Sequence, residues 1–175
     1  AAIEWLKAQR GKWFLWVHVY DPHAPYRAPE PYLSRYASNP YAGEVAFTDA
    51  ALGPLLDLAR VSSDRQTLVT VTGDHGESLG DHGEETHGVF AYEATLRIPL
   101  LMAQYRNGRA TAGDPPASPR VSQWAVQHVD IVPTILDLVM AEGPSTLPGR
   151  SLLTLTRGDA ARRASYFESL SAYLN

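Results

Sequence analysis

Histidines and acidic residues are concentrated in one glycine-rich stretch of the chain, residues 73–88. It contains Asp74, His75, Glu77, His82 and His87. A carboxylate beside an imidazole in a tight turn can bind a divalent cation such as Ca²⁺, Mn²⁺ or Zn²⁺. An isolated pair of this kind could instead cap a helix or stabilise a turn. A solvated loop has no need for so many histidines, however, so we interpret the stretch as a functional site.

Two segments that resemble buried strands lead into polar residues. Residues 13–19 are a nearly continuous aromatic and β-branched run that ends just before His23, and residues 67–72 are a β-branched run that ends just before Asp74. Ligand sites in open α/β sheets form at the carboxyl ends of the strands. We therefore expect His23 and Asp74 at the same edge of one sheet. His18 falls inside the first predicted strand and is expected to be a core residue.

The remaining patterns predict an α/β protein. Apolar spacing predicts a helix near residues 1–10 and another over residues 42–60, with a kink or break at Gly53-Pro54. A further strand is predicted at residues 98–103. Asp130 is expected to cap a helix that extends to Met140. This alternation of strands and helices predicts a layered fold with a mostly parallel sheet flanked by helices.

Composition excludes several classes of protein. The net charge is −4 and the basic residues form no run, so nucleic acid is not an expected partner. No apolar stretch is long enough to span a bilayer, which predicts a soluble segment whose cellular location the sequence does not indicate. The chain has no cysteine, so any metal must be bound by His, Asp or Glu. It opens inside a predicted helix without a Met, which suggests a piece of a longer protein.

Several motifs occur in an order and spacing typical of one family. They are His18-Val19-Tyr20-Asp21-Pro22-His23-Ala24-Pro25-Tyr26, the Tyr-x-Gly-Glu-Val start of residues 41–49, Thr72-Gly73-Asp74-His75-Gly76-Glu77-Ser78-Leu79-Gly80-Asp81-His82-Gly83, Thr86-His87-Gly88, Arg97-Ile98-Pro99, His-Val-Asp-Ile-x-Pro-Thr in residues 128–138 and Leu147-Pro148-Gly149-Arg150. These motifs resemble the C-terminal part of the catalytic domain of sulfatases, within the alkaline phosphatase superfamily. The resemblance covers nearly the whole chain and implies the layered fold of that superfamily, present here as a partial domain over residues 1–175.

The resemblance also implies the roles of individual residues. Asp74 and His75 would be metal ligands, with the other ligands supplied by the absent N-terminal part of the domain. Glu77 and His82 would orient these ligands through hydrogen bonds. The implied ion is Ca²⁺, with Mn²⁺ or Zn²⁺ as alternatives, because many arylsulfatases have Asn at the position of His75 and an imidazole favours transition metals.

His23 and His87 would be the catalytic residues of a sulfate-ester hydrolase. His23 would donate a hydrogen bond or a proton to the ester, and His87 would stabilise the charge of the sulfate. The nucleophile, a formylglycine, is expected in the missing N-terminal part. The segment Thr146-Leu147-Pro148-Gly149-Arg150 imitates the signature for that modification but has Thr at the modified position. This chain alone is therefore expected to be inactive.

Two other functions remain open at this stage. A phosphodiesterase, phosphonate hydrolase or phosphoglycol transferase on the same scaffold is favoured by His75. A noncatalytic module that binds an anion or a glycan is the second alternative, although such a module has little use for a charged metal site. Neither the organic part of the substrate nor the oligomeric state can be predicted from the sequence.

Overall fold

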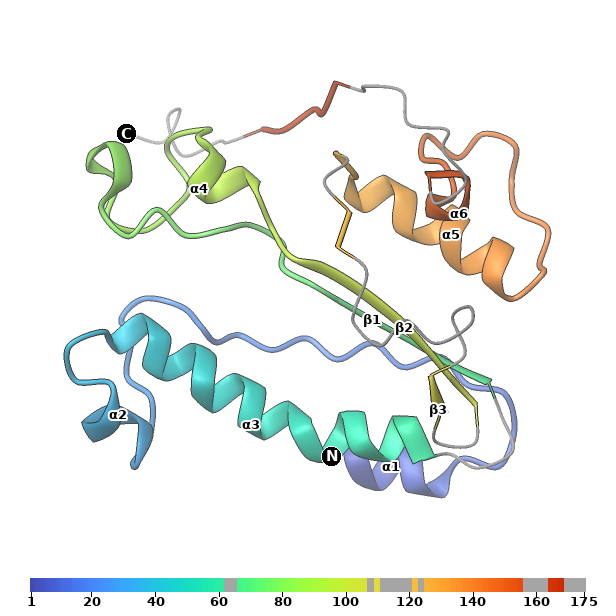
Figure 1. The fold of residues 1–175 in the computed structure, drawn as a ribbon, viewed down its shortest axis with the longest axis horizontal. Helices are drawn as coiled ribbons and strands as arrows, with labels where there is room; N and C mark the ends of the chain where they lie inside the picture. The colour runs from blue at the N-terminus through green and yellow to red at the C-terminus, as the bar shows by residue number, and fades with distance from the viewer. Residues whose placement is uncertain (62–65, 107–108, 111–120, 123–124, 156–163, 169–175) are drawn as a thin grey trace. The chain divides into compact units, whose positions relative to one another are not determined.

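The structure is a computed structural model that describes residues 1–61, 66–106, 109–110, 121–122, 125–155 and 164–168. The chain divides into two compact units (Figure 1). Unit 1 consists of residues 1–87 and 92–115, and unit 2 of residues 88–91 and 116–175. All the residues proposed above for metal binding and catalysis belong to unit 1.

Three helices form one side of unit 1. They are α1 (Ala2–Ala8), α2 (Tyr32–Arg35) and α3 (Pro40–Val61). Both short helices pack against α3, with α2 near its beginning and α1 near its end (Figure 1). The predicted helices at 1–10 and 42–60 are thus confirmed. The predicted break is not found, because α3 continues through Pro54, which removes only one backbone hydrogen bond from a long helix.

The strands of unit 1 form a small antiparallel sheet with the order β1-β2-β3. Strand β1 (Gln66–Thr72) pairs with β2 (Leu100–Arg106), and β2 pairs with β3 (Arg109–Ala110). The strands predicted at 67–72 and 98–103 are confirmed. Thr72 pairs with Leu100, and the Thr72 hydroxyl donates a hydrogen bond to the carbonyl of Pro99 at 2.9 Å. Residues 73–99 therefore leave and re-enter the sheet at the same end.

The prediction of a mostly parallel sheet is not supported, since both pairings among the described residues are antiparallel. The prediction assumed a strand at residues 13–19, which in the structure have no regular secondary structure. A strand needs a hydrogen-bonded neighbour, and no described strand pairs with this segment. Phe14 and Trp16 are instead 74% and 78% exposed.

Unit 2 contains a short 3₁₀ turn (His128–Asp130) followed by α5 (Ile131–Leu138), and a final helix, α6 (Leu152–Leu155). The predicted helix after Asp130 is confirmed, although it ends two residues before Met140 and the Asp130 side chain forms no capping hydrogen bond to α5. Asp130 is fully buried. Its carboxylate accepts hydrogen bonds from the backbone N–H groups of Gln127 and Arg150, both at 3.0 Å, so it joins the start of this helical segment to a distant loop.

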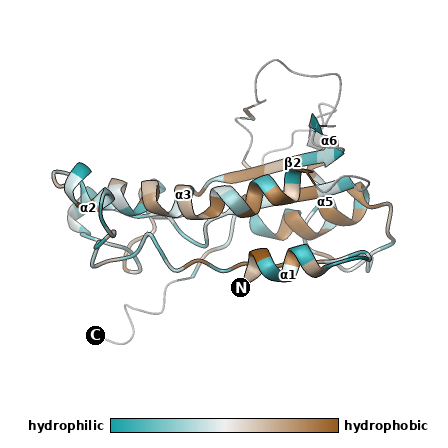
Figure 2. Cartoon of the chain, turned by 90° about the horizontal axis from the view of Figure 1, so that it is seen from below, coloured by the Kyte–Doolittle hydropathy of each residue, from teal (hydrophilic) through white to brown (hydrophobic). Residues whose placement is uncertain are grey.

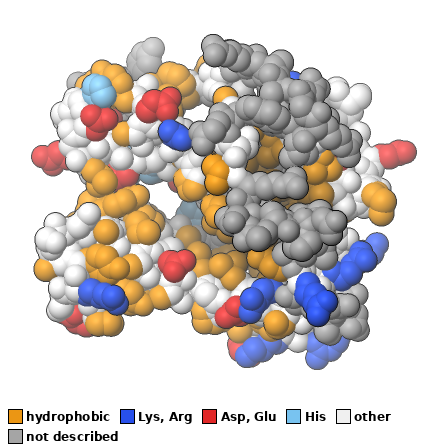
Figure 3. Space-filling model, in the orientation of Figure 1, with side chains coloured by type: hydrophobic (Ala, Val, Ile, Leu, Met, Phe, Trp, Pro, Cys, Tyr) orange, Lys and Arg blue, Asp and Glu red, His pale blue; other side chains and the backbone are white. Residues whose placement is uncertain are grey.

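Buried hydrophobic side chains are few in the part of the chain that the structure describes: Leu6, Ala28 and Ala59. Hydrophobic and hydrophilic residues are intermixed along α3 (Figure 2). Figure 3 shows hydrophobic side chains at the surface over α2 and the beginning of α3, where Leu33 and Val45 are exposed. No helix among the described residues is long and apolar enough to cross a membrane.

Candidate active site

The loop between β1 and β2 is held in place by close backbone contacts. The N–H of Gly76 donates to the carbonyl of Thr95, in helix α4 (Glu93–Leu96), at 2.7 Å. A Cβ at Gly76 would overlap the carbonyl of Ala94, so only glycine allows this approach. Further along the loop, the buried Ser78 hydroxyl donates to Glu84 at 3.2 Å. These contacts therefore fix the backbone that carries the polar side chains of the loop.

Three imidazoles gather beside this loop. The ring of His75 stacks on that of His87 with centroids 3.9 Å apart, and His23 meets His87 edge-on at 5.3 Å. His23 comes from the loop after residues 13–19, far away in the sequence. The structure thus brings together His23, His87 and the Asp74-His75 pair, but not at one edge of a shared sheet as expected, because residues 13–19 form no strand.

Each of the three imidazoles uses its Nδ1 atom to contact the protein. Nδ1 of His23 lies 2.6 Å from the carbonyl of Ala24, and Nδ1 of His75 lies 2.8 Å from the carbonyl of Gly76. A carbonyl only accepts, so both Nδ1 atoms carry the hydrogen. Nδ1 of His87 lies 3.1 Å from the Glu77 carboxylate. No described residue forms a hydrogen bond with the Nε2 atom of any of them, which leaves Nε2 free to bind a ligand.

Asp74 and His75 have the arrangement expected of two ligands of one cation. Nε2 of His75 lies 3.8 Å from Oδ1 of Asp74, which is within the sum of two metal–ligand bonds of about 2.1 Å each. The donation from Nδ1 to a backbone carbonyl is also common for metal-binding histidines. No group of three potential metal-binding side chains occurs among the described residues. Asp74 and His75 therefore fit a divalent cation, and they could supply part of its set of ligands.

The charge state of Asp74 suits metal binding. Desolvation by itself would raise the pKa of Asp74, but the neighbouring charge of His75, backbone hydrogen bonds and the charge of His18 together lower it. The carboxylate is therefore ionised at neutral pH, and its side chain is 81% exposed. The expectation that His18 is a core residue was wrong: it is exposed, and it lies near enough to influence Asp74.

Glu77 contacts His87 rather than the proposed metal ligands Asp74 and His75. Its side chain is only 5% exposed, and it accepts the hydrogen bond from His87. Its charge also raises the pKa of two nearby phenols, although burial is the larger cause for both: the pKa of Tyr26 rises to about 12, and that of Tyr41 rises as well. Glu77 therefore fixes the position of His87. It affects His75 only indirectly, because the His87 ring stacks on the His75 ring.

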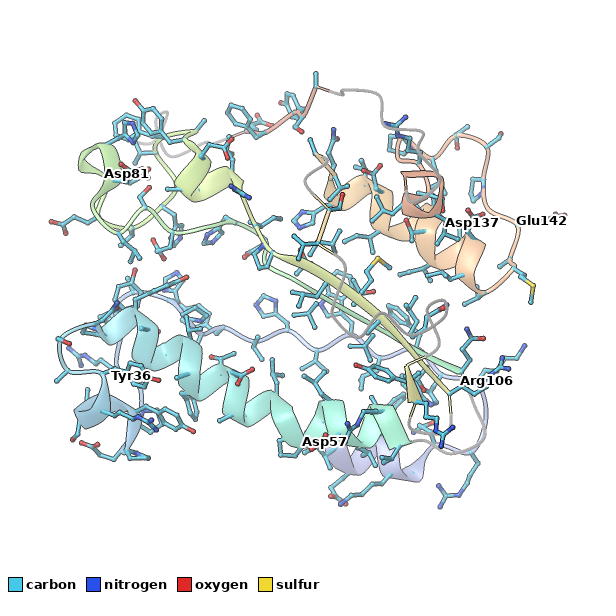
Figure 4. The ribbon with its side chains drawn as sticks, viewed as in Figure 1. Tyr36, Asp57, Asp81, Arg106, Asp137 and Glu142 are labelled. Carbon is cyan, nitrogen blue, oxygen red and sulfur yellow. The ribbon has the colours of Figure 1, made fainter. Side chains whose placement is uncertain are left out.

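His82 lies in a short 3₁₀ turn, Asp81–Gly83, in the same loop. Its Nδ1 lies 3.0 Å from the carboxylate of Asp81, and its ring stacks on Tyr92 at 3.7 Å. Asp81 is labelled in Figure 4. Among the described residues, His82 forms no hydrogen bond, ion pair or ring contact with Asp74 or His75. No direct contact therefore supports its predicted role in orienting Asp74 and His75.

Sequence reasoning missed Glu44, which is 3% exposed and accepts hydrogen bonds from the backbone of the His23 loop. The only signal was its place in the Tyr-x-Gly-Glu-Val motif, which was read as a helix start. It also missed Tyr26, whose hydroxyl is buried near Glu77 without a hydrogen bond of good geometry. Tyr26 is the last residue of the first motif and Glu44 lies near the start of α3, and neither type of residue is by itself a sign of a site.

Comparison with known proteins identifies the family. A sequence model of the sulfatase family matches residues 1–141, so the chain belongs to the sulfatase family, in the alkaline phosphatase superfamily. It is 26% identical over 88% of its length to the uncharacterized sulfatase YidJ of Escherichia coli, and 27% identical over 87% to the multifunctional alkaline phosphatase superfamily protein PehA of Trinickia caryophylli. It is 32% identical over 99% to mouse steryl-sulfatase. It spans 37%, 39% and 29% of these three relatives.

Proposed function

We propose that this chain is the C-terminal portion of the catalytic domain of a metal-dependent sulfatase, which hydrolyses sulfate esters. The observation that supports this most strongly is the group of three imidazoles with free Nε2 atoms beside the ionised Asp74. A sulfate ester is an anion whose hydrolysis creates charge on the leaving oxygen. A site for it needs positive charge and hydrogen-bond donors, and this cluster can provide both.

In the proposed mechanism the three histidines have different tasks. His75 and Asp74 would hold a divalent cation, Ca²⁺ or alternatively Mn²⁺ or Zn²⁺, which when bound would neutralise charge on the sulfate. His23 would act with both ring nitrogens protonated: Nδ1–H stays bonded to the Ala24 carbonyl, and the Nε2 proton passes to the leaving oxygen as its bond to sulfur breaks. His87, with Nδ1–H held by Glu77, would in the same protonated form donate a hydrogen bond from Nε2 to a sulfate oxygen.

The remaining groups of the site would come from the rest of the catalytic domain. We propose that it supplies a formylglycine nucleophile and the other metal ligands. The exposed segment 13–20 supports this, because Phe14, Trp16 and Tyr20 are 68% to 78% exposed and the neighbouring Val17 and Val19 are also exposed. An extended segment that is apolar on both faces is typical of a strand covered on both sides. The relatives contain more than twice this length of chain.

Hydrolysis of phosphate esters or phosphonates is a second candidate. His75 favours it, since an imidazole ligand shifts metal preference toward Mn²⁺ and Zn²⁺. The similarity to PehA, described as a multifunctional alkaline phosphatase superfamily protein, also supports a broader range of substrates. The two candidates predict different substrates for the same site.

Activity measurements on the protein with its complete catalytic domain test both candidates. We expect hydrolysis of 4-nitrophenyl sulfate, with His23→Ala lowering kcat by about 10²–10⁴-fold and Asp74→Ala lowering it further. Asp57→Ala is the control, because Asp57 is exposed on α3 (Figure 4) and Arg60 is its one ion-pair partner among the described residues. Faster hydrolysis of bis(4-nitrophenyl) phosphate would favour the second candidate. Turnover of either ester that survives both Asp74→Ala and chelation would contradict the assignment of chemistry to this site.

A further inference from the structure

We propose that Glu44 is a positioning residue for His23, because it binds the backbone of the loop that carries this histidine. The catalytic consequence rests on the proposed function, whereas the structural role of Glu44 does not. Glu44 lies in the first turns of α3, and His23 lies in the loop that follows residues 13–19. The proposal therefore links the orientation of α3 to the place of a catalytic side chain.

Both oxygens of the Glu44 carboxylate are engaged by the loop. Oε2 accepts a hydrogen bond from the backbone N–H of His23 at 2.9 Å, and Oε1 accepts one from the backbone N–H of Arg27 at 2.5 Å. The two contacts hold the chain on either side of Ala24 and Pro25. A single side chain thus fixes the two ends of a five-residue loop.

The burial of Glu44 makes these hydrogen bonds strong and difficult to replace. The residue is only 3% exposed, and none of the ion pairs formed by the described residues includes it. A buried carboxylate without a cationic partner is stabilised by the N–H groups that it accepts from. Water cannot easily take their place, so the loop and the carboxylate stabilise each other.

The orientation of the His23 ring follows from the position of its backbone. With the backbone held by Glu44, Nδ1 of His23 reaches the carbonyl of Ala24 at 2.6 Å, and the ring of Tyr20 lies 4.5 Å away. The Ala24 carbonyl can only accept, so Nδ1 carries the hydrogen in this contact, and the Tyr20 hydroxyl, 3.0 Å from the same atom, can act only as a second acceptor. Nε2 is therefore the atom that exchanges a proton with a substrate. If the loop shifts, both the place and the tautomer of the imidazole are free to change.

Amide hydrogen exchange of the 175-residue chain, followed by NMR, tests the structural role. Glu44→Gln keeps one acceptor oxygen and points an amide group at the other N–H. We expect exchange at His23, Arg27 or both to become roughly 10- to 100-fold faster, as loss of a hydrogen bond to a charged group implies. The ¹⁵N signals of the His23 ring should also move from a single Nδ1–H form toward a mixture of tautomers.

Glu30→Gln is the matched control, because Glu30 also accepts a backbone N–H, from Ser34 at 3.1 Å, but in an exposed position away from His23. It should change exchange at Ser34 and leave His23 unaffected. Unchanged exchange at both His23 and Arg27 in Glu44→Gln would overturn the proposal. If this variant unfolds, Glu44→Asp is measured instead, and it should affect residues 23–27 more than β1. A uniform increase over α3 and β1 in that variant would also overturn the proposal.

The catalytic consequence is measured in the protein with its complete catalytic domain. Glu44→Gln should lower kcat for an aryl sulfate by roughly 10- to 100-fold, a part of the contribution of a general acid, with little change in KM. Glu44→Asp, which keeps both oxygens, should restore part of kcat. If the protein hydrolyses no ester but the exchange results hold, the proposed function fails and the role of Glu44 stands. If the protein is active and Glu44→Gln leaves kcat unchanged, only the positioning role fails.

Discussion

The imidazole of His87 stacks on that of His75, with ring centroids 3.9 Å apart and an angle of 29° between the planes. The contact exists because the loop after β1 turns back on itself and is fixed to α4 through Gly76. It places the side chain proposed to bind the anion directly against one proposed to bind the metal. The sulfate and the cation would therefore share one small site.

Metal binding by this chain alone should be weak. Asp74 and His75 provide two donors, and a cation held by two protein ligands keeps most of its water. Calorimetric titration with Ca²⁺, Mn²⁺ and Zn²⁺ should show only weak binding, and Asp74→Ala should remove most of it. Asp81→Ala is the control, since Asp81 pairs with His82 instead. Tight binding that Asp74→Ala abolishes would show that the chain contains a complete metal site.

Tyr26 should remain protonated to unusually high pH. Burial, together with the charge of Glu77, raises the pKa of Tyr26 to about 12 from 10.0. The unfolded chain loses this proton near pH 10, so the stabilising contribution of the neutral phenol is complete below pH 10 and is lost as the pH rises to about 12. Phenolate absorbance should show a late-titrating tyrosine that Tyr26→Phe removes. The free energy of unfolding should fall less over this range in the variant, and equal losses in both proteins would contradict the prediction.

The sequence predicted local structure better than the arrangement of strands. Residues 67–72 and 42–60 carry patterns that determine a strand and a helix within a few residues of their bounds, because these patterns act locally. Pairing is not local, and residues 13–19 have a strand pattern without a described neighbour to pair with. A parallel sheet was inferred by assuming that this segment lies next to β1.

The sequence-based prediction of the site depended on residue types that can bind metals or transfer protons. His23, Asp74, His75 and His87 were predicted to form a site because histidines and carboxylates after strand-like segments are uncommon elsewhere, and the structure places their side chains close together. Glu44 could not be found in this way, because its role depends on burial and on two backbone N–H groups from another segment. The sequence alone shows neither of these properties.

Replacement of Asp130 should destabilise unit 2. Asp130→Ala removes the acceptor of the Gln127 and Arg150 backbone N–H groups in a fully buried position. Each buried donor left without a partner costs about 1–3 kcal/mol. The free energy of unfolding in urea should fall by an amount in this range or above. Asp137→Ala, on the exposed side of α5 (Figure 4), should change it by less than about 0.5 kcal/mol. Equal effects of the two substitutions would contradict the assigned role of Asp130.

Two glycine-to-alanine substitutions in unit 1 should differ in their effects on stability. Gly53 lies inside α3, and a Cβ there meets no atom within 4 Å beyond its chain neighbours. Alanine favours a helix over glycine, but the ring of the following Pro54 disfavours a helical residue that carries a Cβ, so Gly53→Ala should change the stability by less than about 1 kcal/mol. At Gly76 a methyl group overlaps the backbone carbonyl of Ala94, which cannot rotate away as a side chain could. Gly76→Ala should therefore destabilise unit 1 by about 1–3 kcal/mol and separate the site loop from α4.

Urea unfolding and amide exchange together distinguish strain at the site from a general loss of stability. In Gly76→Ala, exchange at the Gly76 position should increase because its hydrogen bond to Thr95 lengthens, and the NMR signals of the neighbouring His75 and of the stacked His87 should shift with it. In Gly53→Ala these signals should stay in place. A Gly76→Ala protein with wild-type stability and unshifted imidazole signals would mean that the close approach of the loop to α4 does not position the histidines.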